Sequence, residues 1–109
     1  MKEHRPFDAK QAADAERSLY AALLTLETAD ECQRFLADLC TPAELEAMVD
    51  RWAVVPLLRE GVPYRRIHDI TGVSVTTIGR VARYLSSGNG GYQLALARLE
   101  GRSSRKALQ

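Results

Sequence analysis

The chain has 109 residues, a formal net charge of +1 and only 2 cysteines. This length suits one domain, or one protomer of an assembly. No apolar run approaches the roughly 20 residues that span a membrane, and the N-terminus has no hydrophobic signal core, so we expect a cytoplasmic chain with no membrane partner. Cys32 and Cys40 form no CxxC motif and no histidines cluster, so neither a metal nor a cofactor is expected, and two buried, reduced thiols are the simpler interpretation.

Charge is distributed unevenly along the chain. Residues 1–50 hold 5 Lys and Arg against 11 Asp and Glu, a balance of −6, whereas residues 51–109 hold 10 against 3, a balance of +7. A basic second half suits a polyanionic partner, and an acidic first half suits a solvated face.

Helical periodicity recurs along the chain and no alternating strand of useful length is present, which predicts an all-α fold of six short helices. The predicted helical domain covers residues 8–100, between a flexible N-terminal arm over 1–7 and a disordered basic tail over 101–109. The first helix is expected over 8–27, the second and third open at Thr28 and Thr41, and the last three cover 64–70, 74–85 and 92–99.

Two Thr-x-x-Glu segments, "TADE" at 28–31 and "TPAE" at 41–44, predict helix starts, because the hydroxyl and the carboxylate can satisfy end amides reciprocally. Gly61 is expected to cap the third helix, and Pro56 to kink it or end it early. Apolar positions expected to face inward are Leu19, Leu23, Leu26, Cys32, Phe35, Leu36, Leu39, Leu45, Met48, Val49, Trp52 and Val55. Three loosely packed helices cannot hide that much apolar surface, so we expect a homodimer.

Residues 64–85 match a helix-turn-helix with Gly72 at the turn. At 100° per residue Thr76, Arg80 and Arg83 fall on the outward face, where arginine and threonine can contact bases or phosphates of double-stranded DNA. The alternative is that these arginines only solubilise a surface helix. The apolar positions expected to pack the two helices together are Ile67, Val73, Ile78 and Val81, continued by Ala82 and Leu85.

The predicted DNA contacts divide by role. His68 stands four residues before the turn glycine, in a slot that usually holds alanine, so either the helices cross more widely or His68 points toward phosphate. No arrangement of acid, base and nucleophile emerges, and no enzymatic activity is expected. Arg65, Arg66 and His68 are expected to position phosphates, Val75, Thr76, Gly79 and Arg80 to face base edges after the Ser74 cap, and Arg83 to contact the backbone.

From "CTPAELEAMVDRW" through "LLREGVPYRRIHDITGVSVTTIGRVARYL" the chain resembles the bacterial tryptophan repressor superfamily, most closely the Trp-repressor-like YerC/YecD family. The resemblance covers roughly residues 15–100. It implies an intertwined, all-helical homodimer of Trp-repressor type, whose two helix-turn-helix heads reach successive major grooves of a palindromic operator. It also implies a transcriptional regulator, and specifically a repressor. The family tolerates residues other than alanine at the slot of His68.

The resemblance implies an effector site between the third and fifth helices as well. Two arginines and a threonine hold the amino-acid ligand there, and they match Arg51, Arg80 and Thr41. Val81 and Tyr84 stand where a glycine and a serine leave room for the indole, so tryptophan is not the expected corepressor. Either an apolar plug replaces the effector, or the site takes a smaller or differently shaped small molecule.

The two arginines of this site also have interpretations that involve no ligand. Without a ligand, Arg80 would face outward to the groove or pair with a carboxylate, and Arg51 would be a structural charge paired with Asp50 or Glu46. Two alternatives to a transcriptional regulator also stay open: a DNA-binding replication or recombination accessory, and a helical adaptor whose acidic first half binds a protein.

Overall fold

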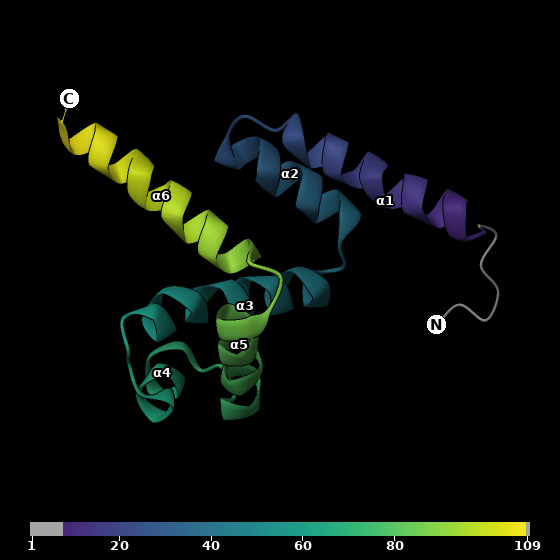
Figure 1. The fold of residues 1–109 in the computed structure, drawn as a ribbon. Coiled ribbons are helices and arrows are strands. Elements are labelled where there is room, and N and C mark those ends of the chain that lie inside the picture. Colours follow the sequence, from purple (N-terminus) through teal and green to yellow (C-terminus); the bar gives the residue numbers. More distant parts are fainter. Residues whose placement is uncertain (1–7, 109) are drawn as a thin grey trace. The chain divides into compact units, whose positions relative to one another are not determined.

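The computed structural model describes residues 8–108, and within that range all regular structure is helical. This confirms the predicted all-α class, while the predicted arm over 1–7 lies outside the described residues. The chain divides into two compact units, one ending at Pro42 and one beginning at Ala43. No helix of the described range combines the length and apolarity that a bilayer crossing needs. The six helices are α1 (Ala9–Leu24), α2 (Ala29–Leu39), α3 (Pro42–Arg59), α4 (Tyr64–Thr71), α5 (Val75–Ser87) and α6 (Gly91–Leu108) (Figure 1).

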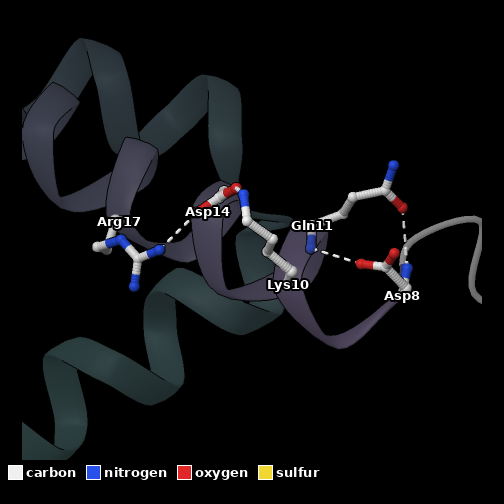
Figure 2. A network of polar contacts seen from close by, with 5 residues as sticks. All are labelled: Asp8, Lys10, Gln11, Asp14 and Arg17. Atoms are coloured by element: carbon white, nitrogen blue, oxygen red, sulfur yellow. Dashed lines mark hydrogen bonds and ion pairs between the residues drawn. The ribbon is translucent and has the colours of Figure 1, made fainter.

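The first helix, α1, begins with a reciprocal cap. The Gln11 amide donates to Asp8 Oδ1 at 2.8 Å, and the Asp8 amide donates to Gln11 Oε1 at 2.9 Å (Figure 2). One turn further, Asp14 accepts from Lys10 at 3.2 Å and from Arg17 at 2.5 Å. The cap satisfies end amides that the helix itself leaves free, which explains why the helix starts after Asp8 as predicted.

The α1 helix stops at Leu24, earlier than the predicted end at Glu27. The Thr25 hydroxyl donates to an α1 carbonyl at 2.6 Å, and Thr28 already caps α2 by accepting from the Glu31 amide at 3.1 Å. The Glu31 carboxylate accepts from the Glu27 amide at 2.9 Å instead of the Thr28 amide, so only half of the predicted reciprocal box forms. Residues 25–27, which periodicity assigns to the first helix, therefore connect α1 to the Thr28 cap of α2.

Neither α1 nor α2 contains a buried residue. Leu23 and Leu39, both expected to face inward, are exposed, and Leu24 is 86% exposed. Cys32 is exposed and Cys40 half-buried, so the prediction of two buried thiols is wrong. The other apolar positions that were expected to face inward are half-buried: Leu19, Leu26, Phe35 and Leu36. Two helices alone therefore enclose this apolar stripe only in part within a single copy.

The hydrophobic core lies in the second unit, where α4 packs on α5 and α5 on α6 (Figure 1). Four of its members are the predicted junction of the helix-turn-helix, which confirms that part of the prediction. The buried residues are Val54, Val55, Ile67, Val73, Ile78, Val81 and Leu96.

The α3 helix buries only part of the predicted stripe, because Val55 is buried as predicted and Leu45 is half-buried, whereas the other three positions are exposed. Val54 and Val55 are fully buried, whereas Met48 and Trp52 are exposed and Val49 is 57% exposed. The helix-turn-helix packs only against the C-terminal half of α3, so the apolar residues nearer its start meet no core within one chain.

The end of α3 follows the predicted cap but not the predicted early stop. The helix continues past Pro56 to Arg59, because a proline removes one amide without forbidding the turn that follows. Gly61 has φ 81°, its amide donates to the Leu58 carbonyl at 3.0 Å, and the Val62 amide donates to the Leu57 carbonyl at 3.1 Å. These paired bonds form a Schellman motif, and they confirm the Gly61 cap.

The last helix is longer than expected. The α6 helix reaches Leu108, so the prediction of a disordered tail over 101–109 is wrong as far as that residue. The tail contains arginine, lysine, alanine and leucine, which favour helices, and one internal glycine costs a helix only about 1 kcal/mol. Arg59 and Glu100 form an ion pair between α3 and α6, and Gln93 donates to the Leu85 carbonyl of α5 at 2.7 Å.

Candidate nucleic-acid interface

The α4–α5 connection is a tight turn fixed by local hydrogen bonds. Gly72, at φ 76°, ends α4 and donates its amide to the His68 carbonyl at 2.8 Å. Ser74 then caps α5 by accepting from the Thr77 amide at 3.1 Å. Only glycine adopts a positive φ without strain, so α4 ends before Gly72, and the three residues 72–74 separate it from the start of α5 at Val75.

The first turn of α5 presents its side chains to solvent. Ile78 and Val81 are buried against α4 and α3, whereas Thr76 is exposed and Val75 is 51% exposed. Ser74, also expected at the interface, is exposed but uses its hydroxyl oxygen for the cap. A helix tip with one packed face and one open face has the geometry that entry into a major groove requires.

Four arginines of α4 and α5 carry uncompensated charge. Arg65 and Arg66 lie exposed on α4, and Arg80 and Arg83 lie exposed on α5. Within the described part of the chain none of them forms an ion pair with a carboxylate. No carboxylate neutralises these four charges by an ion pair in the described range, so the alternative pairing of Arg80 with an acidic residue is not seen.

Gly79 lies at the contact between the two helices. A Cβ built on it would come 4.0 Å from the Tyr64 ring of α4, and the residue is half-buried. The Tyr64 ring therefore lies beside Gly79, which was predicted to face base edges. This aromatic neighbour could not be predicted from the sequence, because Tyr64 and Gly79 lie on different helices and their contact depends on how those helices pack.

Arg80 is held by an aromatic ring of its own helix. Its guanidinium carbon lies 4.7 Å from the centroid of the Tyr84 ring, and that of Arg83 lies 5.8 Å away. Both distances are within the range of a cation–π contact. The i, i+4 spacing of Arg80 and Tyr84 could have indicated this pairing.

A cavity of about 390 Å³ opens beside this pair. It brings Arg51 of α3 together with Arg80 and Tyr84, three residues of the predicted effector site, and Tyr92 of α6 stacks obliquely on Trp52 with ring centroids 6.3 Å apart. The cavity is lined by Arg51, Arg80, Val81, Tyr84, Asn89, Gly91 and Tyr92. Its volume falls within the range of ordinary ligand pockets, so Val81 and Tyr84 wall the space without filling it.

The remaining effector-site predictions have mixed outcomes. Among the described residues Arg51 forms no ion pair with Asp50 or Glu46, so its reading as a paired structural charge is wrong. Thr41 belongs to the first unit, ahead of α3, and its part in the site stays a prediction.

His68 makes a contact that the sequence did not suggest. Its Nδ1 atom lies 2.8 Å from the Val73 carbonyl oxygen, across the turn. The ring is thus bonded within the helix-turn-helix, whereas the prediction had it extended toward phosphate. A separation of five residues around a turn leaves no periodic signal that would reveal such a bond.

Comparisons with known proteins agree on one family. Residues 16–100 match the family described as Trp repressor protein. The YerC protein of Bacillus subtilis (strain 168) is 43% identical over 82 residues, which cover 75% of this chain and 79% of YerC. The crystal structure of a TrpR-like protein from Eubacterium eligens superposes with a TM-score of 0.78 at 38% identity, over 85% of this chain and 96% of that one. A second crystal structure, from Staphylococcus aureus, superposes with a TM-score of 0.76 at 38% identity, over 80% of this chain and 87% of that one.

Proposed function

The chain belongs to the Trp repressor family, and from this premise we propose that it is a transcriptional regulator that binds a specific sequence of double-stranded DNA. The family consists of DNA-binding regulators and not of enzymes, in agreement with the expectation from the sequence. The observation that carries the proposal is the open first turn of α5, on a helix-turn-helix whose four exposed arginines have no carboxylate partner in the described range.

The contacts follow from where these side chains lie. Val75 and Thr76 are compact, exposed and at the helix tip, so they read base edges, with the valine methyls suited to a thymine methyl. Arg65, Arg66 and Arg83 contact phosphates and set the register on the duplex. Arg80 is drawn toward Tyr84 and the cavity, so base reading depends less on it than the sequence suggested.

We further propose that the chain acts as a homodimer and represses by occupying promoter DNA. Supporting the dimer, α1 and α2 have no buried residue in one copy, and a second copy would cover their apolar stripe. Two copies related by a two-fold axis would bind a palindrome with half-sites about 10 base pairs apart, centre to centre.

A small-molecule effector is a second role that the cavity favours. Two guanidiniums, from Arg51 and Arg80, would attract an acidic group, and Tyr84 and Tyr92 would flank it. Tryptophan is not the expected ligand, because Val81 and Tyr84 line the cavity at the positions where the family resemblance implies a glycine and a serine, and their larger side chains leave less room for an indole. Titration calorimetry with L-tryptophan is expected to give no micromolar binding, and a micromolar Kd would contradict this expectation.

Selection of bound sequences from random duplex DNA, with and without candidate metabolites, tests the function. A palindromic consensus is the expected result, and its position in promoters or near a replication origin separates a repressor from a replication accessory. A helical adaptor would enrich no sequence, and that result would contradict the proposal. A consensus that appears only with a metabolite would identify the effector.

A further inference from the structure

The turn between α4 and α5 is tied twice by one residue. The His68 carbonyl accepts from the Gly72 amide at 2.8 Å, and the ring Nδ1 of His68 lies 2.8 Å from the Val73 carbonyl oxygen. A carbonyl oxygen can only accept, so Nδ1 carries the proton and donates it. His68 thereby holds the turn through both its main chain and its side chain.

The carbonyl that His68 holds belongs to Val73, the residue directly before the Ser74 cap of α5. The Val73 side chain is buried in the core, and Ser74, the next residue, caps the helix. Thr71 adds a second tie, because its hydroxyl accepts from the Val73 amide at 3.1 Å and donates to the Ile67 carbonyl at 2.7 Å. With both polar groups of the Val73 backbone fixed, the direction in which the first turn of α5 leaves the core is fixed as well.

We propose that His68 is a positioning residue, which aligns the first turn of α5 through the Val73 carbonyl, and not a phosphate ligand. In a neutral ring that donates from Nδ1, Nε2 has no proton and is an acceptor. A phosphate oxygen is also an acceptor, so Nε2 offers it no hydrogen bond. The effect of His68 on DNA affinity rests on the proposed function. The role of His68 in the geometry of the turn does not depend on that function.

Two isosteric variants separate the roles in the free protein. In His68→Asn the amide nitrogen takes the place of Nδ1, whereas in His68→Gln it takes the place of Nε2. We expect ¹⁵N NMR of the wild-type ring to show the proton on Nδ1, and backbone amide shifts and hydrogen exchange over 73–77 to stay near wild type in H68N and to change in H68Q. A proton on Nε2 of the neutral ring, or equal behaviour of the two variants, would overturn the proposal.

The same pair is then measured on the duplex enriched by selection. H68N is expected to bind within about threefold of wild type and H68Q about tenfold more weakly, since H68Q leaves the Val73 carbonyl without its donor. The reverse order would identify His68 as a phosphate ligand through Nε2 and overturn the proposal. If wild type itself binds no duplex, the proposed function fails, while the measurements on the free protein still decide the role of His68.

Discussion

At the scale of single residues, Arg80 and Arg83 differ although they lie on the same helix. Arg80 contacts the Tyr84 ring and lines the cavity. Arg83 lies further from that ring and is not among the residues that line the cavity. A side chain committed to a ring and a cavity is less free to reach a base edge or a phosphate. The two arginines should therefore respond differently to substitution.

Arg83→Ala is expected to weaken binding to all duplexes alike and to lower the slope of log affinity against log salt by about 1, because one phosphate contact is lost.

Arg80→Ala should leave that slope nearly unchanged. If Arg80 reads a base in spite of Tyr84, its loss would instead relax specificity by about 1–3 kcal/mol at one position. Anisotropy titrations over several salt concentrations measure both effects, with Arg102→Ala on α6 as the control that should change neither.

At the scale of elements, what could be predicted from the sequence depended on how local the determinants are. The junction residues Ile67 and Ile78 follow from a period of 3.6 and a turn glycine, and both are buried. The extension of α6 to Leu108 was missed, because a polar, basic composition predicted disorder where helix propensity is also high. The cavity could not be predicted without the family resemblance, since it is formed by helices that are distant in the sequence.

The packing of α4 on α5 can be tested with two identical substitutions on one helix. Ile67 is fully buried and Ile70 is 56% exposed, yet both belong to α4. Ile67→Val is expected to lower the free energy of unfolding by about 0.5–1.5 kcal/mol through the lost methylene, and Ile70→Val by less than about 0.5 kcal/mol. Urea unfolding at one fixed protein concentration measures both, and equal losses would contradict the assigned core.

At the scale of the whole molecule, the two units differ in how much they can bury alone. Among the residues whose burial is described, the second unit has a core of seven buried residues, whereas α1 and α2 of the first unit contribute none. Apolar surface in water is unfavourable by roughly 25 cal/mol per Å². A second copy of the chain that covers this stripe would therefore stabilise the dimer relative to two separate chains.

The mass in solution tests this expectation. One chain weighs 12.1 kDa, and light scattering at micromolar concentration is expected to give about twice that value, as for most symmetric assemblies. Leu23→Glu places a charge on the apolar stripe that Leu19, Leu23 and Leu26 form, and should shift the mass toward one chain, whereas Glu16→Gln on the same helix should not. A wild-type mass near 12.1 kDa would contradict the dimer.

The central claim is that α4 and α5 recognise a DNA sequence, and a pair of affinities tests it most directly. The wild-type protein is titrated into the selected duplex and into a scrambled duplex of equal length and composition, at one near-physiological salt concentration. The account predicts at least about a thousandfold preference for the selected duplex, the lower end of the range for specific DNA-binding proteins. Equal affinities for the two duplexes would contradict it.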